Sequence, residues 1–297
     1  MGKPGRKILR EVLPQWKEKY KPDAIIVNVE NLAHGKGVTP STLAEIDDLG
    51  IDCFTSGNHI FKKGDLTAES FEKYPKLIRP ANFGDALPGH GYYRFSKRLT
   101  PPFRQLADPP HELGRENNTA KSLPSPRNGE GQGEVEKFQQ FLVVNLNGQV
   151  FMEKQFDGPI ANPFLAVDQL ISEQGQKGDI IIVDFHAEAT SEKVAMGLHL
   201  NGKVAGVFGT HTHIPTADAR VLSGGTGYVT DVGMVGTRDS ILGVIPANAL
   251  KRFLNSEEKF VYEVEEEGVL QINGVLVEVD ENQKVVKIEK LYQEVWD

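Results

Sequence analysis

The chain has little cysteine, no excess of positive charge and no long apolar run. Its 297 residues include a single cysteine, Cys53, which excludes an internal disulfide and is expected to be a buried strand residue. A formal net charge of −8 argues against a general nucleic-acid or membrane-surface binder, since such proteins carry basic patches. No apolar run is long enough to span a bilayer, and the basic start lacks the apolar segment of a signal peptide. We therefore expect a cytoplasmic protein.

Short apolar runs alternate with segments of helical periodicity through most of the chain. The run at 24–29 is rich in β-branched residues and predicts a strand buried on both faces. Apolar residues at three- and four-residue spacing predict a helix at about 4–20. Because Pro14 lies inside this segment, we expect the helix either to be kinked or to begin late. This alternation of strands and helices predicts an α/β layered fold. The other expected strands are 51–55, 178–185 and 204–208, and the other expected helices are 39–49, 163–174 and 190–199.

The C-terminal part changes to an alternation of apolar and polar residues. Strands are expected at 260–265, 269–279 and 285–292, with turns at Asn273-Gly274 and at 280–282. Such alternation is typical of an antiparallel meander with one solvated face.

Residues about 99–136 interrupt this order with a stretch rich in proline and glycine. The stretch cannot bury enough apolar surface to offset its ordering entropy, so we expect it to be disordered. The flanking runs at 91–95 and 138–144 are expected to pair as a hairpin. The insert is then either a tolerated insertion at the hairpin tip or a lid or partner-binding loop.

Four of the expected strands end in residues that commonly bind metals. His211 and His213 stand two positions apart, and their side chains would point to the same side of an extended chain. Sites in open α/β sheets form at the carboxyl ends of the strands, so these residues predict a metal centre rather than surface side chains. Imidazole, carboxylate and amide ligands together suit iron, manganese or zinc. The other residues that follow strand ends are Glu30, Asn31, Asn58, His59 and His186.

Several short segments carry motifs that belong together. They are Pro4-Gly5-Arg6, Val29-Glu30-Asn31 with 33–37, Gly57-Asn58-His59, 79–82, 184–193, 209–213 and 230–234. Together they resemble the calcineurin-like metallophosphoesterases and, among these, the YmdB-type 2′,3′-cyclic-nucleotide 2′-phosphodiesterases. The resemblance covers nearly all of the chain outside the insert. It implies a single domain over 1–297 with a four-layer α/β/β/α sandwich and mixed sheets.

The resemblance also implies a centre of two divalent ions, iron or manganese, with zinc as the alternative. These ions would activate a bridging hydroxide and offset the charge that builds on the phosphoryl oxygens. His59 would be the general acid that protonates the leaving alkoxide, or else would hold a neighbouring ligand in place. The implied ligands are Glu30 and Asn31, which would bind or bridge the metals, Asn58, His186 and His211 on one metal, and His213 on the other.

Further polar residues near these motifs leave two interpretations open. Asp184 and Glu188 would either orient ligand histidines or cap the helix that follows. His34 and Lys36 would either line the mouth of the substrate site or form a solvated turn. Asp231 is expected to be structural.

The family pattern includes a strand before Pro4 that ends in a metal-binding aspartate. In this sequence Met1 stands two places after that aspartate. We expect either a start codon assigned to an internal methionine or a truncated homologue that is inactive or regulatory and binds a metal or nucleotide. A phosphomonoesterase on the same scaffold is a further alternative. The expected partner is a small phosphodiester or cyclic nucleotide, with no membrane and no general nucleic acid, and a homo-oligomer is compatible with this interpretation.

Overall fold

The computed structural model describes residues 2–99, 138–152 and 154–296. The predicted insert at 99–136 lies, beyond its first residue, outside the described part, so its disorder stays a prediction. Its two flanks pair as predicted: β3 (Tyr92–Arg98) runs antiparallel to β4 (Phe138–Asn147), with Tyr92 opposite Val144.

The largest sheet has six strands in the order β3-β4-β5-β6-β8-β7. Its centre, from β4 to β8, is parallel, whereas each edge strand is antiparallel to its neighbour. The inner residues of β4 and β5 are almost all buried, because layers cover both faces of these strands. The four further strands are β5 (Ile180–His186), β6 (Gly206–Thr210), β7 (Arg220–Val221) and β8 (Gly227–Val229).

Two smaller sheets complete the strand layers. In the first, β1 (Ile26–Asn28) runs parallel to β2 (Cys53–Thr55), where Cys53 is fully buried as predicted. The second is antiparallel, in the order β11-β10-β9. Its strands are β9 (Gly236–Thr237), β10 (Leu270–Val279) and β11 (Val285–Val295).

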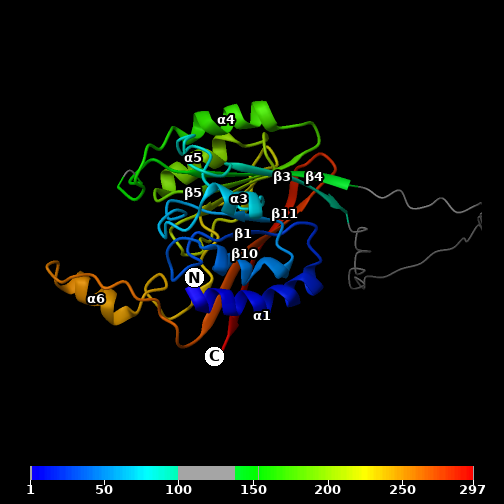
Figure 1. Ribbon diagram of the computed structural model, residues 1–297. Coiled ribbons are helices and arrows are strands. Elements are labelled where there is room, and N and C mark those ends of the chain that lie inside the picture. The colour runs from blue at the N-terminus through cyan, green and yellow to red at the C-terminus, as the bar shows by residue number, and fades with distance from the viewer. Residues whose placement is uncertain (1, 100–137, 153, 297) are drawn as a thin grey trace, which may run out of the picture.

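The longer helices α1, α4 and α5 lie on two opposite sides of the strands (Figure 1). On one side are α4 and α5, and apolar residues from both, such as Val167 and Met196, join the core of the six-stranded sheet. On the other side α1 packs against β9 and β10. The predicted α/β/β/α layering with mixed sheets is therefore confirmed. The helices are α1 (Gly2–Tyr20), α2 (Pro40–Ala44), the 3-10 helix η1 (Asp47–Leu49), α3 (Ala68–Lys73), α4 (Pro163–Gln174), α5 (Thr190–His199) and α6 (Pro246–Leu254).

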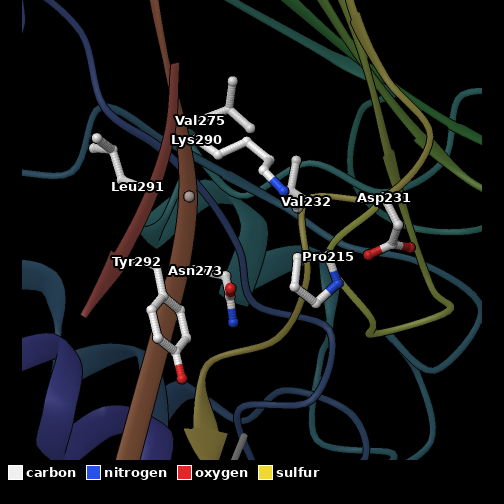
Figure 2. A pocket seen from close by; sticks show the side chains of 9 residues that line it. Pro215, Asp231, Val232, Asn273, Val275, Lys290, Leu291 and Tyr292 are labelled. Carbon is white, nitrogen blue, oxygen red and sulfur yellow. The ribbon is translucent and has the colours of Figure 1, made fainter. Parts of the chain in front are cut away.

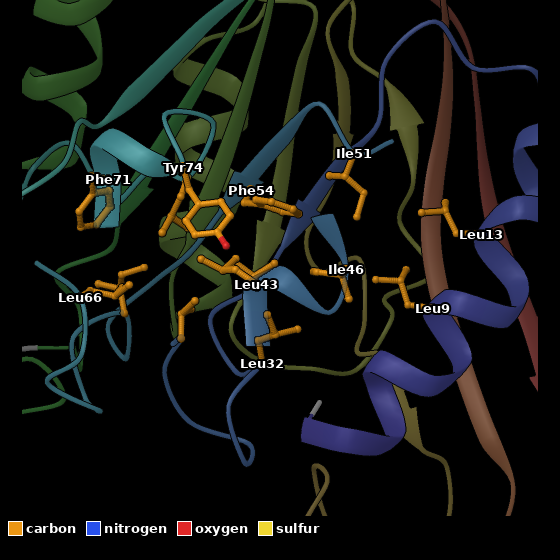
Figure 3. Close-up of a cluster of buried hydrophobic side chains, with 14 of the residues drawn as sticks. Leu9, Leu13, Leu32, Leu43, Ile46, Ile51, Phe54, Leu66, Phe71 and Tyr74 are labelled. Atoms are coloured by element: carbon orange, nitrogen blue, oxygen red, sulfur yellow. The ribbon is translucent and has the colours of Figure 1, made fainter. Parts of the chain in front are cut away.

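A second apolar core joins α1 to β2 and the short helices beside it (Figure 3). Leu9 and Leu13 of α1 reach toward Ile46 and Ile51, and Phe54 lies fully buried at its centre. Burial of each such side chain contributes about 1.5–3 kcal/mol. This core therefore holds β1 and β2 in place, and with them the polar residues that follow these strands.

The N-terminal helix differs from the prediction. α1 runs from Gly2 to Tyr20 with Pro14 inside it, so a late start is wrong. Ile8 and Val12 on its apolar face are buried, whereas Pro14 is exposed. A carbonyl that loses its helical hydrogen bond on an exposed face can bond to water instead, which makes the proline tolerable.

Three further expectations about strands are corrected. β1 is only half-buried, because in the described part of the chain it pairs with β2 alone. Asn273 and Gly274 lie inside β10 rather than in a turn, and the Asn273 amide donates to the Met234 carbonyl at 2.7 Å. The strand predicted at 260–265 is reduced to one isolated bridge, between Val244 and Val264. The strand that pairs with β10 on that side is β9.

The turn predicted at 280–282 does connect β10 and β11, which form a long hairpin. Among the described residues, no helix combines the length and the apolar character needed to cross a membrane.

Candidate metal centre

Residues at the carboxyl ends of β1, β2, β5 and β6 meet at one point. Glu30 Oε2 lies 2.5 Å from His186 Nε2. The same His186 nitrogen is 3.0 Å from Asn58 Oδ1 and 3.0 Å from His211 Nδ1. Within the described ranges, Glu30, His186 and His211 offer ligand atoms that all lie within 4.8 Å of one another. The structure thus brings together four side chains that are far apart in the sequence.

These donor atoms fit a divalent transition metal. Two imidazole nitrogens, a carboxylate oxygen and an amide oxygen form the mixed set that such ions accept. The backbone leaves room for them at Gly57, where an added Cβ would lie 2.3 Å from the His186 ring and 2.5 Å from Glu30 Oε2. Glycine is therefore required between β2 and Asn58.

Burial keeps the imidazoles in the form that binds metals. It lowers the pKa of His211 to about 4, the pKa of His186 well below its ordinary value, and the pKa of His213 as well. Burial also raises the pKa of Glu30, although the neighbouring histidines oppose this. Neutral imidazoles are the ligand form, and a bound cation would favour the ionised carboxylate.

The unfolding free energy of the metal-free protein is therefore expected to fall as the pH falls. Burial holds the pKa of His59 and His211 at about 4, whereas histidine in an unfolded chain titrates near 6.5. Between these values the unfolded state binds protons that the folded state does not, so acidification favours unfolding. Asp184, whose pKa is raised to about 6 by burial, and Glu30, whose pKa burial also raises, oppose this trend. The lowered pKa values of His186 and His213, added to those of His59 and His211, leave the histidines in excess.

Urea unfolding with a chelator, at about pH 7 and about pH 5, measures this effect. Each net proton contributes about 1.4 kcal/mol per pH unit. Equal or greater stability at the lower pH would contradict the burial of neutral histidines.

A chain of hydrogen bonds sets the tautomer of His186. Its Nδ1 is 2.9 Å from Thr210 Oγ1, and the Thr210 hydroxyl donates to Asp184 Oδ1 at 2.7 Å. The other Asp184 oxygen accepts from Asn28 at 2.9 Å and from Thr55 at 2.5 Å. Because the Thr210 proton goes to Asp184, its oxygen accepts the proton on His186 Nδ1. The lone pair of His186 Nε2 then points at Glu30, Asn58 and His211.

Glu188 sets the tautomer of His211 in the same way. His211 Nε2 lies 2.8 Å from Glu188 Oε2, which leaves Nδ1 to face His186. Residue Ala189 caps α5 without a side-chain hydrogen bond, so neither Asp184 nor Glu188 caps that helix. Both carboxylates therefore hold the histidine rings, Asp184 through Thr210 and Glu188 directly, as the orienting interpretation expects, and the metal-binding role of these rings stays a prediction. Thr210 was not predicted, because a threonine at the end of a strand carries no distinguishing pattern.

Asn31 and His213 form a second polar group beside the first. Asn31 Nδ2 lies 3.4 Å from His213 Nε2. His213 Nδ1 is buried and has no hydrogen-bond partner among the described residues. A buried nitrogen without a hydrogen-bond partner destabilises the fold, and a metal ligand whose ion is absent would be in this situation. Glu30 interacts electrostatically with both His211 and His213, so it lies near both groups.

His59 lies against the candidate ligands rather than among them. Its backbone N–H donates to Glu30 Oε1 at 2.8 Å, and the Asn58 amide nitrogen is 3.4 Å from its Nδ1. An amide donor at Nδ1 leaves the proton of the neutral ring on Nε2. Lys36 adds positive charge to the surroundings of His59.

The loop at 33–37 gives Lys36 a defined position. Lys36 Nζ lies 4.0 Å from the centre of the Tyr262 ring, whose hydroxyl donates to the Gly35 carbonyl at 2.7 Å. Burial, together with Lys62 and Lys63, lowers the pKa of Lys36. His34 is exposed, with a φ of 52°. Lys36 thus lies against Tyr262 with its charge near His59, whereas His34 faces solvent.

A hollow of about 120 Å³ lies beside the β10–β11 hairpin (Figure 2). It is open between the β10–β11 hairpin, which contributes Asn273 and Lys290, and the segment of Asp231 and Val232. None of the candidate ligands lines it, although Asp231 touches both this hollow and the loop that carries His211.

The chain matches a known protein family over nearly its whole length. The family described as "YmdB-like protein" matches residues 1–107 and 105–291. A 2′,3′-cyclic-nucleotide 2′-phosphodiesterase of Bacillus subtilis (strain 168) is 36% identical over 293 residues, which cover 98% of this chain and 93% of that protein.

Two solved structures share the fold. A protein from Mycoplasma pneumoniae, described as a novel phosphatase, has a TM-score of 0.77 and 32% identity, covering 100% of this chain and 90% of that one. A hypothetical protein from Thermus thermophilus has a TM-score of 0.76 and 30% identity, covering 99% and 96% of the two chains. The resemblance noted from the motifs is thereby confirmed, and the chain belongs to the YmdB-like family.

Proposed function

We propose that this protein is a metal-dependent phosphodiesterase that hydrolyses 2′,3′-cyclic nucleotides at a centre of two divalent ions. The convergence of donor atoms from Glu30, His186 and His211 on one point carries the proposal. The name of the Bacillus subtilis relative supports the substrate class. The proposed unit is one domain over the whole chain.

The proposed ligands divide into two groups that share Glu30. Bound iron or manganese, with zinc as the alternative, would supply an activated nucleophile and offset the charge that builds on the phosphoryl oxygens. Thr210 and Glu188 would hold two of the imidazole rings in the ligand tautomer. One ion would be held by Glu30, Asn58, His186 and His211, and the other by Glu30, Asn31 and His213.

His59 is the proposed general acid for the leaving ribose oxygen. Its Nε2–H is the proton-bearing position, because Asn58 faces Nδ1. With a pKa of about 4 the ring is neutral in the metal-free protein. A bound phosphodiester carries a negative charge, which raises the pKa of a nearby imidazole and favours its protonated form. Lys36, whose charge acts on His59, would attract the same anion.

Turnover by the purified chain tests the proposal. With Mn²⁺ or Fe²⁺ present, we expect hydrolysis of 2′,3′-cAMP in preference to 3′,5′-cAMP and p-nitrophenyl phosphate, and about two ions per chain by elemental analysis. A preference for p-nitrophenyl phosphate would favour a phosphomonoesterase. One ion or none, without turnover, would favour a regulatory binding protein.

A further inference from the structure

A buried ion pair lies behind the loop that carries His211 and His213. Lys193 Nζ is 2.9 Å from Asp231 Oδ2, and each side chain is only 1% exposed. Lys193 comes from α5 and Asp231 follows β8. The removal of two charges from water is costly unless further hydrogen bonds compensate for the lost hydration. Both residues belong to the family motifs, and the proposed chemistry uses neither.

Three further hydrogen bonds of this pair go to Thr212, the residue between the two histidines. Thr212 donates to Asp231 Oδ2 through its N–H at 3.0 Å and through its hydroxyl at 2.7 Å. Lys193 Nζ donates to Thr212 Oγ1 at 2.8 Å. The other oxygen of Asp231 accepts the N–H of Gly233 at 2.8 Å. Thr212 is thus tied to both members of the pair.

These hydrogen bonds hold a loop whose backbone is strained on both sides of Thr212. His211 has a φ of 91° and His213 a φ of 66°. Residues other than glycine rarely adopt these values, which persist only when surrounding contacts impose them. Gly209, two residues before His211, is closely packed as well. A Cβ at this position would lie 1.7 Å from the Thr230 carbonyl oxygen and 3.0 Å from Lys193 Cδ.

We propose that Lys193, Thr212 and Asp231 form a clamp that positions His211 and His213 for the two metal ions. The inference rests on the proposed function, which assigns one of these histidines to each ion. Because only Thr212 separates the histidines, one set of hydrogen bonds places a ligand of each ion. Lys193, Thr212 and Asp231 are positioning residues: they act through the histidines and touch no reacting atom.

A matched pair of variants tests the clamp. Thr212→Val removes the hydroxyl but keeps the side-chain shape and leaves the Lys193–Asp231 pair in place, whereas Thr212→Ser keeps the hydroxyl. For the metal-stripped chain titrated with Mn²⁺ in a calorimeter, Thr212→Val is expected to weaken binding by about tenfold to a hundredfold. The Mn²⁺ affinity of Thr212→Ser is expected to stay within about threefold of the wild-type affinity, a much smaller change than that of Thr212→Val.

A second ion pair separates positioning from general stability. Arg94 and Asp179 pair at 2.8 Å at the start of β5, at the opposite end of the strand from His186. Arg94→Met is therefore expected to lower the Tm without weakening Mn²⁺ binding. Wild-type Mn²⁺ affinity in Thr212→Val, or an equal loss in Arg94→Met, would overturn the clamp.

Imidazole ¹⁵N NMR of the metal-free chain gives a readout that does not depend on metal. Thr212→Val is expected to shift or broaden the ring signals of His211 and His213 and to leave His199, on α5, unchanged. If the wild type binds no Mn²⁺, the metal centre is wrong, and these signals still decide the clamp. Unchanged His211 and His213 signals would overturn it.

Discussion

Replacing His186 with alanine is expected to lower kcat/KM for 2′,3′-cAMP by about a thousandfold or more and to remove metal from the purified protein. His186 Nε2 faces Glu30, Asn58 and His211 at once, so its loss takes the central donor out of the site. Metal ions contribute several kcal/mol of transition-state stabilisation, and about 4 kcal/mol corresponds to a thousandfold in rate.

His199→Ala is the matched control for that variant. His199 is the last residue of α5, which covers the six-stranded sheet that contains His186. It pairs with Asp168 on α4 at 2.9 Å. Its replacement is expected to leave metal content and turnover near the wild type. Because His186 is buried, the Tm of each metal-free variant must show that it folds. A folded His186→Ala protein that keeps two ions and full activity would contradict the proposed centre.

Replacing His59 with asparagine is expected to slow hydrolysis by an amount that depends on the leaving group. The ribose alkoxide needs a proton, so loss of a general acid costs about 10²–10⁴-fold with 2′,3′-cAMP. The p-nitrophenolate ion leaves without a proton, so bis(p-nitrophenyl) phosphate is expected to lose less than about tenfold. Measurement of kcat with both substrates therefore separates proton donation from other roles.

Metal content is the control for the His59 variant. His59 touches Glu30 only through its backbone N–H, which asparagine keeps. The variant is therefore expected to hold as many ions as the wild type. Equal losses on both substrates, or a loss of metal, would show instead that His59 holds a neighbouring ligand in place.

The location of the candidate site was predictable because the sequence indicates where the strands end. Apolar runs predicted β1, β2, β5 and β6, and the residues directly after them carried the Glu, Asn and His side chains. Glu30 follows β1 of the two-stranded sheet, and His186 ends β5 of the six-stranded sheet, 156 positions later in the numbering. They meet because the carboxyl ends of the two sheets lie together, where Asn28 and Thr55 donate to Asp184.

Other features were misread because local patterns do not report tertiary pairing. Asn273-Gly274 is a typical turn signal, yet it lies inside β10 because the register opposite β11 and a bond to Met234 hold it extended. Pro14 signals a helix break, yet α1 continues because the packing of its buried face outweighs one lost hydrogen bond.

Periodicity and motif spacing are local properties, so the layered fold, the family and the residue types at the strand ends could be predicted from the sequence. How those residues are held depends on the tertiary structure. Thr210 and Glu188 set the ring tautomers, and Lys193 reaches Thr212 and Asp231 across three separate segments. Such contacts depend on distances between side chains that no spacing along the chain encodes.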